Sequence, residues 1–426
     1  MKLPEAFETY TKKMMGTERY QRFSEALDEA PPVSIRLNRW TEPVRVADVW
    51  NGGAVEWCPD GVYLKGRPSF TFDPMLHAGA YYVQEASSMF ASHVLRQLVG
   101  RLGNEPLAML DLCAAPGGKT TCALQALPAG SVLVANEPMR NRASVLCENL
   151  QKWLSFSGEW EGTADRGFSV AVTSNYARDF AKARLSFDLI MADVPCSGEG
   201  MFRKDSGAVG EWSEEHVDRC WRLQRDIVAD IWPCLRPGGY LVYATCTFNT
   251  KENEENVQWI ARQLGAEGVV IPVEQGWNIT GSLLEDCPLP VCRFIPGYTR
   301  GEGLFMAVLR KHGDEVRSTA KTRRELIPAV EKRLHRLPMD HLTALHEAAE
   351  APCVELNAAQ AVAYLRREAV TLPPDVPRGM VRMCFQGAVL GLAKNVGNRA
   401  NNLYPKEWRI KSTHVPEPAA IVEREL

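Results

Sequence analysis

Two cysteines stand at the ends of short apolar runs, in settings where a thiol could do chemistry. Cys196 lies in the run Asp193-Val194-Pro195-Cys196, and Cys246 lies in the run Tyr243-Ala244-Thr245-Cys246. A thiolate is the reactive form of cysteine, and its formation depends on a lowered pKa. A single cysteine is most often a small buried apolar residue. Two cysteines that each follow a strand of one sheet favour a shared reactive site instead.

Methylation of a cytosine at carbon 5 needs the residue types that these two runs supply. A thiolate that adds to carbon 6 makes carbon 5 nucleophilic enough to attack a sulfonium methyl group, after which a base removes the carbon-5 proton and the thiolate leaves. A carboxyl group such as Asp193 could hold the cytosine edge through N3 and the amino group. One of Cys246 and Cys196 would attack and the other would assist release, and residue chemistry alone does not rank them.

A glycine-containing turn indicates a place for the methyl donor. The run Asp111-Leu112-Cys113-Ala114-Ala115-Pro116-Gly117-Gly118-Lys119-Thr120 joins an expected strand to an expected helix. Adjacent glycines let the backbone approach a ligand and leave helix N–H groups pointing at it. The phosphate-binding loop is excluded because Cys113 stands where its first glycine must be. The turn therefore suits a nucleoside-type cofactor, with expected contacts from Cys113, Ala114, Ala115, Pro116, Gly117, Gly118 and Lys119.

An acidic residue ends the next expected strand. Glu137 follows Gly117 by 20 residues, and an acid at this place accepts hydrogen bonds from the ribose hydroxyls of a nucleoside cofactor. The alternative is an exposed glutamate after a tight turn. Asp111 could face the cofactor amine or simply fix the loop backbone.

The elements that must position these residues alternate between strand and helix. Expected strands, separated by helical patterns, cover residues 108–112, 131–136, 170–173, 187–193 and 240–245. This order predicts an α/β fold with a doubly wound, mostly parallel, Rossmann-like sheet. Ligands bind such sheets at the carboxyl ends of the strands, where both cysteines are expected.

The remaining segments predict smaller units on either side of this sheet. Residues 1–75 read as a small α+β unit with a helix from Pro4 to Leu27, and residues 76–311 as the catalytic domain. The polar, basic segment 312–330 reads as a linker. Residues 331–426 read as a small C-terminal unit with one helical stretch from Glu331 to Ala349 and short strands near 381–385.

Composition narrows the class of protein. The chain has 426 residues with 45% hydrophobic and 24% charged residues, which is ordinary for a globular protein. No apolar run reaches the roughly 18 residues of a membrane span, and the N-terminus has no signal-peptide core. Twelve cysteines without a C-x-x-C pair predict reduced thiols and no metal site. We therefore expect a cytoplasmic protein.

Charge is distributed unevenly although the net charge is only −3. The stretch from Arg310 to Arg324 holds six Lys or Arg residues, and the stretch from Arg378 to Ser412 holds seven against the single acid Glu407. A local basic face can bind phosphates on an acidic protein. The alternative for either stretch is an ordinary solvated surface.

At these runs the chain resembles the Sun (Nol/Nop/Sun) family of RNA cytosine-5 methyltransferases. The matching pieces are residues 82–89, 111–120, 193–204 and 243–256, within a resemblance that covers about residues 75–311. It implies S-adenosylmethionine as cofactor, held by Cys113 through Lys119, Glu137 and Asp193. It also implies that Cys246 is the nucleophile and that Cys196 aids release. Many members carry an Asp that holds the adenine amine after the third strand, where this chain has Asn175-Tyr176. The alternatives for this contact are Asn175, a backbone group, or packing of Tyr176 near the adenine.

The C-terminal residues 387–394 and 401–409 resemble the PUA-like RNA-binding domain of bacterial small-subunit ribosomal RNA methyltransferases. The resemblance implies RNA as partner, with 16S rRNA or the small ribosomal subunit as the leading substrate, no membrane partner, and a monomer. Two alternatives stay open. One is the same reaction on tRNA, which the cysteine loops do not distinguish. The other is a catalytically silent RNA-binding assembly factor on a methyltransferase scaffold.

Overall fold

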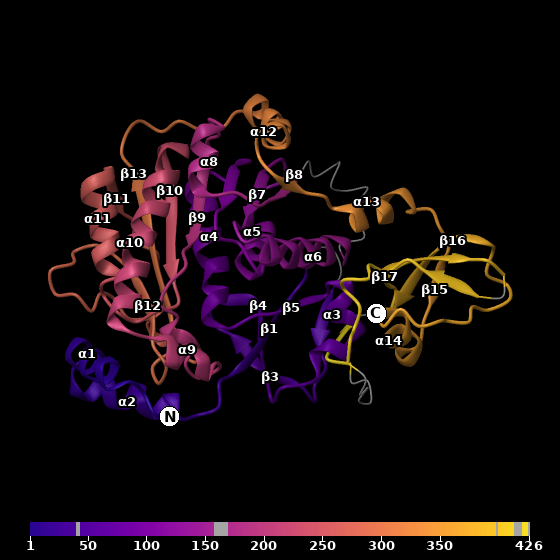
Figure 1. Cartoon of the computed structure of the whole chain (residues 1–426), viewed down its shortest axis with the longest axis horizontal. Helices are drawn as coiled ribbons and strands as arrows, with labels where there is room; N and C mark the ends of the chain where they lie inside the picture. The colour runs from indigo at the N-terminus through magenta and orange to yellow at the C-terminus, as the bar shows by residue number, and fades with distance from the viewer. Residues whose placement is uncertain (40–42, 157–168, 398, 413–419, 425–426) are drawn as a thin grey trace.

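The computed structural model describes residues 1–39, 43–156, 169–397, 399–412 and 420–424 (Figure 1). Its largest feature is a nine-stranded sheet in the middle of the chain. A smaller sheet precedes it and another follows it in sequence. Within the described residues, no helix is both long and apolar enough to cross a membrane.

The N-terminal unit consists of two short helices and a four-stranded sheet. The helices α1 (Glu5–Met15) and α2 (Thr17–Leu27) are separate because Gly16 between them has φ 77°, so the expected single helix is interrupted. The sheet has the order β3-β4-β1-β5, formed by β3 (Asn51–Val55), β4 (Cys58–Leu64), β1 (Val33–Leu37) and β5 (Tyr81–Val83). Because β5 pairs antiparallel with β1, the N-terminal sheet extends beyond the predicted boundary at residue 75.

The central sheet confirms the predicted doubly wound α/β fold. Its order is β11-β13-β10-β9-β6-β7-β8-β14, with β12 paired to β13. The five parallel strands are β6 (Ala108–Asp111), β7 (Val132–Asn136), β8 (Ser169–Thr173), β9 (Phe187–Asp193) and β10 (Leu235–Thr245). Antiparallel strands complete the edges: β11 (Ala266–Gly268), β12 (Cys292–Phe294), β13 (Leu304–Lys311) and β14 (Arg336–Leu337).

Neighbouring residues of the central strands face two different cores. In β6, Met109 belongs to one apolar cluster and Leu110 to the other. Alternation of this kind follows from the two-residue period of a strand, and burial on both faces explains the continuous apolar runs in the sequence. The covering helices are α4 (Phe90–Arg101), α5 (Gly118–Ala126), α6 (Arg140–Phe156), α8 (Ala177–Lys182), α10 (Glu214–Ile231) and α11 (Glu254–Leu264), with the short α9 (Ser206–Glu211) following the loop that carries Cys196.

The segment expected as a linker is partly helical and packs on the central sheet. Helix α12 (Ala320–Arg333) buries Leu326 and Val330, which are spaced by one helical turn, in the same core as Leu110. The helix expected from Glu331 to Ala349 is divided, because α12 ends at Arg333, β14 pairs with β8, and α13 (Asp340–Glu347) begins only afterwards. The residues between the two helices instead form the edge strand β14 of the central sheet.

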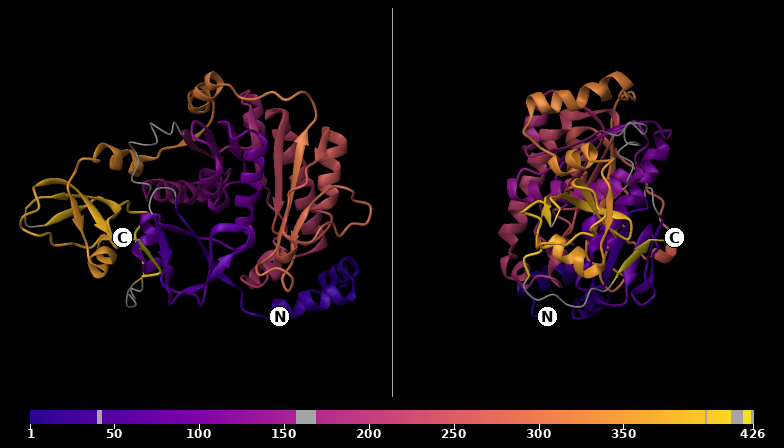
Figure 2. Two further views of the ribbon diagram at one scale, coloured as in Figure 1. Left: turned by 180° about the vertical axis from the view of Figure 1, so that it is seen from behind. Right: turned by 90° about the vertical axis from the view of Figure 1, so that its right-hand side faces the viewer.

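The C-terminal unit is a four-stranded sheet at the end of the molecule far from α1 and α2 (Figures 1 and 2). Its order is β15-β16-β17-β18, from β15 (Cys353–Glu355), β16 (Gly379–Phe385), β17 (Ala388–Asn395) and β18 (Ala400–Asn402), with α14 (Ala358–Leu365) packed on it. The predicted strand near residues 381–385 is therefore present.

The C-terminal region contacts the N-terminal sheet region. Strand β19 (Val422–Arg424) pairs antiparallel with β2 (Val44–Val46). Ile35 of the N-terminal sheet and Val381 of the C-terminal sheet lie in one apolar cluster. His77 of α3 (Pro74–Ala78) lies with Nδ1 3.3 Å from the Tyr404 hydroxyl. The N-terminal sheet and the C-terminal sheet thus share a core, whereas α1 and α2 pack in a different apolar cluster.

Candidate active site

A cavity of about 590 Å³ opens at the carboxyl ends of the central parallel strands. The loops after β6, β7, β8, β9 and β10 all contribute to its lining, as expected for a doubly wound sheet. The sequence-predicted residues that line it are Cys113, Ala115, Lys119, Glu137, Asn175, Asp193, Cys196 and Cys246. Ala114, Pro116, Gly117 and Gly118 belong to the same loop but do not line the cavity.

The two candidate thiols lie together at this cavity. Cys196 Sγ is 3.3 Å from Cys246 Sγ. They meet because β9 and β10 are parallel neighbours, with Asp193 paired to Ala244, so that both loops leave the same edge. The pKa of Cys196 is raised well above the usual thiol value, mainly by its hydrogen bond with Cys246 and then by burial. Cys196 therefore keeps its proton at neutral pH.

A salt bridge lies beside the thiols. Lys119 Nζ donates to Asp193 Oδ2 at 2.7 Å, and the two side chains are 13% and 30% exposed. Burial lowers the pKa of Lys119, but Asp193, the Cys246 sulfur and Asp111 together outweigh it and raise that pKa. The cavity therefore presents a fixed cation and a carboxylate next to each other and close to Cys246.

Asp111 fixes the start of the loop after β6. Its Oδ2 accepts a hydrogen bond from Thr120 Oγ1 at 2.6 Å, and the residue is fully buried. Burial, and secondarily the charge of Asp193, raises the pKa of Asp111 to about 7 against the hydrogen bond from Thr120. Asp111 is absent from the lining of the cavity; its Oδ2 is bonded to the side chain of Thr120 in α5, and its Oδ1 has no hydrogen-bond partner among the described residues.

Glu137 is buried but lines the cavity. Its Oε1 accepts from the Met139 backbone N–H at 3.0 Å. Its Oε2 has no hydrogen-bond donor among the described residues, although Arg142 Nη1 lies 3.3 Å away. A buried carboxylate oxygen without a donor is costly. The Oε2 atom of Glu137 is therefore suited to accept hydrogen bonds from a ligand.

The loop and Glu137 together fit a nucleoside cofactor. Gly117 has φ 116°, a conformation that favours glycine, and it caps the N-terminus of α5. The first N–H groups of α5 are consequently directed toward the loop. Glu137 lines the same cavity and directly follows the next strand, β7, at the distance along the chain where such folds hold ribose hydroxyls.

Asn175 lines the cavity, but its polar groups already have partners. Its side-chain amide donates to the His335 carbonyl at 3.0 Å and accepts from the His335 N–H at 3.1 Å. Its backbone is bonded to the Asn136 amide. The neighbouring Tyr176 also lines the cavity and is 60% exposed. The Tyr176 ring is therefore available to a ligand, whereas the Asn175 amide is already hydrogen-bonded to His335.

Several residues at the site were not expected from the sequence. Leu223 and Ile227 of α10, with Met139 and Arg142, complete the cavity wall; the apolar exposure of Leu223 (46%) and Met139 (55%) is visible only in the folded chain. Arg203, which lies in the run after Cys196, is 4% exposed, and its Nε donates to Glu302 at 2.9 Å. Arg203 is thus a buried structural residue.

Buried polar residues also connect the two cysteine loops to each other. Glu199 follows Cys196, while Asn249 and Glu252 follow Cys246, and all three are at most 1% exposed. The sequence feature that could have indicated Asn249 and Glu252 is the polar run that follows the apolar strand 240–245.

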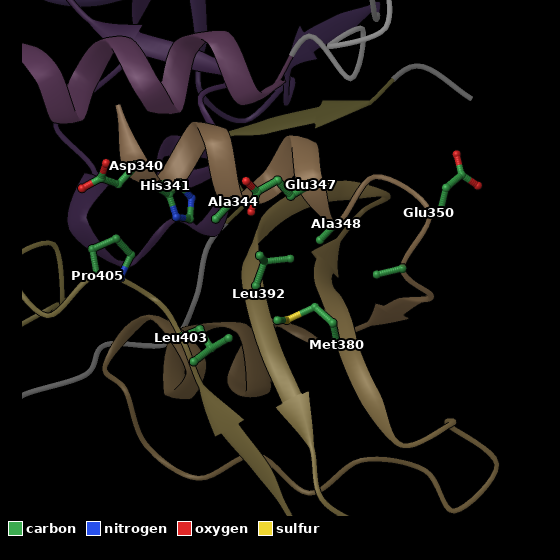
Figure 3. A pocket seen from close by; sticks show the side chains of 11 residues that line it. Asp340, His341, Ala344, Glu347, Ala348, Glu350, Met380, Leu392, Leu403 and Pro405 are labelled. Atoms are coloured by element: carbon green, nitrogen blue, oxygen red, sulfur yellow. The ribbon is translucent and has the colours of Figure 1, made fainter. Parts of the chain in front are cut away.

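Another hollow, of about 760 Å³, lies between α13 and the C-terminal sheet (Figure 3). Its lining contains no cysteine, lysine or arginine among the described positions, so the chemistry considered above does not belong there. The described residues also contain no cluster of three or more His, Cys, Asp or Glu side chains arranged to hold a metal ion.

Comparisons with protein families match three consecutive parts of the chain. The family described as 16S rRNA methyltransferase RsmB/F matches residues 102–310. The N-terminal domain of 16S rRNA methyltransferase RsmF matches residues 3–86, and the methyltransferase RsmF PUA domain matches residues 351–410.

Individual proteins give the same result. The chain is 29% identical to ribosomal RNA small subunit methyltransferase F of Aliivibrio fischeri, over 95% of this chain and 97% of that protein. It is 33% identical to the protein of that name from Photobacterium profundum, over 69% and 57% of the two chains. A methyltransferase homolog from Pyrococcus horikoshii superposes with a TM-score of 0.57 at 24% identity, covering 72% of this chain and 95% of that one, which is a likeness of fold.

Proposed function

The chain belongs to the family of RsmB/F-type methyltransferases, in its RsmF-like branch, and from that premise we propose that it methylates carbon 5 of a cytosine in 16S rRNA with S-adenosylmethionine as donor. The relatives are named as small-subunit ribosomal RNA methyltransferases, which supports the substrate. The carbon-5 position and the covalent route are our inference from the site.

One observation carries this proposal: the Sγ atoms of Cys196 and Cys246 lie 3.3 Å apart at the cavity. Methylation of an unactivated carbon requires a covalent nucleophile and a group that helps it leave again. Two thiols in contact meet both requirements. Methyl transfer to an oxygen or an exocyclic nitrogen would need neither.

The raised pKa of Cys196 supports Cys246 as the attacking residue. A Cys196 thiol that keeps its proton can donate it in a hydrogen bond to the Cys246 sulfur, which leaves Cys246 as the candidate nucleophile. The ammonium of Lys119 lies at the same site, and the Cys246 sulfur is one of the groups that raise the pKa of Lys119. The family resemblance ranks the two cysteines in the same order.

The residues then perform the following steps. The Cys246 thiolate forms a bond to carbon 6, and carbon 5 becomes nucleophilic. Bound S-adenosylmethionine supplies the electrophilic methyl group. After carbon 5 has been methylated, a base removes its proton and the bond between Cys246 sulfur and carbon 6 breaks. The Cys196 thiol, hydrogen-bonded to the same sulfur, stabilises the departing thiolate.

The Lys119–Asp193 pair is suited to the cytosine edge. The Asp193 carboxylate can accept from the amino group, while the neighbouring ammonium of Lys119 can donate to a ring acceptor. The 2.7 Å contact between them keeps donor and acceptor side by side. For the cofactor, Glu137 would hold the ribose hydroxyls, Cys113 and Ala115 of the loop after β6 would contact its remainder, and Tyr176 would pack against its base.

Transfer of tritiated methyl groups from S-adenosylmethionine to purified 16S rRNA and tRNA, followed by bisulfite sequencing, tests the proposal. We expect 5-methylcytosine in 16S rRNA and none in tRNA. Cys246→Ala should lower transfer by about three orders of magnitude or more and leave cofactor binding unchanged. Cofactor binding without transfer to any RNA would favour the silent assembly factor, and retained turnover in Cys246→Ala would overturn the assignment of the nucleophile.

A further inference from the structure

Two loops of separate origin must be held together for the two thiols to touch. Their backbones approach very closely: the Gly200 N–H donates to the Cys246 carbonyl at 2.7 Å. A Cβ atom at position 200 would lie 2.4 Å from that carbonyl oxygen. Such an approach leaves room only for glycine and depends on groups that hold the loops in this arrangement.

Glu199 reaches from the Cys196 loop to the Cys246 loop. Its Oε2 accepts from the backbone N–H groups of Phe248 at 2.6 Å and Asn249 at 3.0 Å. Its Oε1 accepts from the Trp212 indole at 3.0 Å. The turn that immediately follows Cys246 is therefore bound to a side chain of the opposite loop.

Glu252 reaches in the reverse direction. Its Oε2 accepts from the Ser197 backbone N–H at 3.1 Å and from Gln224 Nε2 at 2.6 Å. Gln224 also donates to the Pro195 carbonyl at 2.9 Å. The residues on both sides of Cys196 are thus bound, directly or through Gln224, to a side chain from the Cys246 loop.

One amide connects the two acids. Asn249 Nδ2 lies 3.0 Å from Glu199 Oε1 and 2.8 Å from Glu252 Oε1. Every one of these partners donates to the carboxylates, and all of the side chains are buried. Buried networks of this kind hold one arrangement because each broken bond leaves an unsatisfied group.

We propose that Glu199 and Glu252, joined by Asn249, are positioning residues that hold Cys196 against Cys246 for the reaction. They act through the cysteines and touch neither substrate nor cofactor. The inference rests on the proposed function for its consequence in catalysis, but the geometry that it predicts exists without RNA or cofactor.

Electrostatics agree with this arrangement. Burial, followed by the charge of Glu199, raises the pKa of Glu252 to about 7, while hydrogen bonds from Ser197, Asn249 and Gln224 oppose the shift. Protonation of Glu252 would place a donor among groups that all donate. The network should consequently loosen as the pH falls below about 7.

Oxidative cross-linking of the resting protein measures the contact directly. Diamide takes two electrons and two protons from a pair of touching thiols, which become a disulfide while its N=N bond is reduced to a hydrazine. Mass spectrometry then follows the peptide that links Cys196 to Cys246. A second pair in the same sample, Cys353 and Cys384 with Sγ atoms 3.1 Å apart in the C-terminal sheet, is an internal reference.

Glu252→Gln and Glu199→Gln should each slow the Cys196–Cys246 cross-link about tenfold or more, with the reference pair unchanged. The kcat for methyl transfer should fall while KM for S-adenosylmethionine stays constant. Glu252→Asp should restore part of the cross-linking rate and part of kcat. Asp73→Asn, at an acid equally buried in a different core, should leave the cross-link unaffected. If Glu252→Gln does not fold, Gln224→Leu removes the donor that joins Glu252 Oε2 to the Pro195 carbonyl instead and should also slow the cross-link.

An unchanged cross-linking rate in the glutamate variants would overturn the proposal. So would an equal slowing of both cysteine pairs, which would indicate general loosening of the fold. If the cross-links behave as expected but the wild-type protein methylates no RNA, the proposed function fails and the positioning role stands.

Discussion

At the residue scale, the site depends on how two chemically identical thiols are made different. The hydrogen bond with Cys246, and then burial, raise the pKa of the Cys196 thiol, and the Cys246 sulfur contributes to the raised pKa of Lys119. The difference between the two cysteines therefore comes from their neighbours. Each thiol can then be tested by its own substitution.

Loss of the Cys196 side chain should trap the reaction after attack. In Cys196→Ala the Cys246 sulfur can still add to carbon 6, but the departing thiolate loses its hydrogen-bond donor. We expect a covalent protein–RNA complex that survives denaturing gel electrophoresis and depends on S-adenosylmethionine. The double variant Cys196→Ala/Cys246→Ala is the control and should give no complex. A gel of Cys196→Ala without the complex would contradict the release role.

Loss of the Glu137 charge should weaken cofactor binding selectively. Its Oε2 has no donor among the described residues, and charge-assisted hydrogen bonds are worth about 1.5–3 kcal/mol. Glu137→Gln should therefore raise the Kd for S-adenosylmethionine roughly ten- to a hundredfold by isothermal titration calorimetry. Glu148→Gln, on α6 but in an ion pair with Lys152, should leave Kd unchanged. Equal affinity of Glu137→Gln and wild type would exclude the ribose contact.

The residue types of the site could be predicted from the sequence, whereas their pairings could not. Asp193 ends β9, Cys246 and Glu137 directly follow β10 and β7, and Cys196 lies in the loop after β9. Their common edge therefore follows from the topology. The hydrogen bonds between Asn175 and His335, which are 160 residues apart in the chain, form because β14 pairs with β8. No local pattern indicates such a contact.

At the element scale, prediction succeeded where burial is periodic and failed where short elements attach to an edge. The parallel strands are apolar on both faces and were recognisable. Helix α12 carries only Leu326 and Val330 as buried residues within a polar sequence, which is typical of a linker until the sheet that they cover is known. The division between α12 and α13 follows from the pairing of β14 with β8.

The close approach of the two cysteine loops gives a prediction at the same scale. Gly200→Ala would place a Cβ 2.4 Å from the Cys246 carbonyl oxygen, so the loops must separate. Because a misplacement of about 1 Å can cost about a hundredfold in rate, kcat for 16S rRNA should fall by at least about tenfold. Gly210→Ala is the control, since nothing lies within 4 Å of a Cβ there, and it should keep the wild-type rate. Equal rates in the two variants would show that the loop contact is dispensable.

At the scale of the whole molecule, the terminal units are parts of one structure. Val422 of the last strand is fully buried against β2, and the N- and C-terminal sheets share an apolar cluster. Deletion of everything after about residue 315 would therefore also remove α12 and expose core. Point substitutions on the C-terminal sheet are consequently the sounder test of its part in RNA binding.

The core shared by the N- and C-terminal sheets contains groups whose protonation changes the stability of the fold in opposite directions as the pH falls. Burial, and then the charge of Lys152, lowers the pKa of His77 to about 3 and that of His341 to about 4. Burial raises the pKa of Asp73 in the same region to about 6 against hydrogen bonds from Met75, Tyr81 and Ile421. As the pH falls below about 6.5, the unfolded chain gains protons on the histidines that the folded chain refuses, and stability is lost. Asp73 opposes this loss between about pH 6 and 4.

His77→Gln isolates the histidine contribution from that of Asp73. A neutral side chain at this place can still donate to the Thr71 carbonyl, which lies 2.8 Å from His77 Nε2, but it takes up no proton in the unfolded chain. Between pH 7.5 and 5.0 the free energy of unfolding of the wild type should therefore fall by roughly 2 kcal/mol more than that of His77→Gln, at about 1.4 kcal/mol per pH unit below 6.5. Urea denaturation at both pH values measures it. Equal losses in the two proteins would mean that His77 is protonated in the folded state and that its contact with Tyr404 does not exclude the charge.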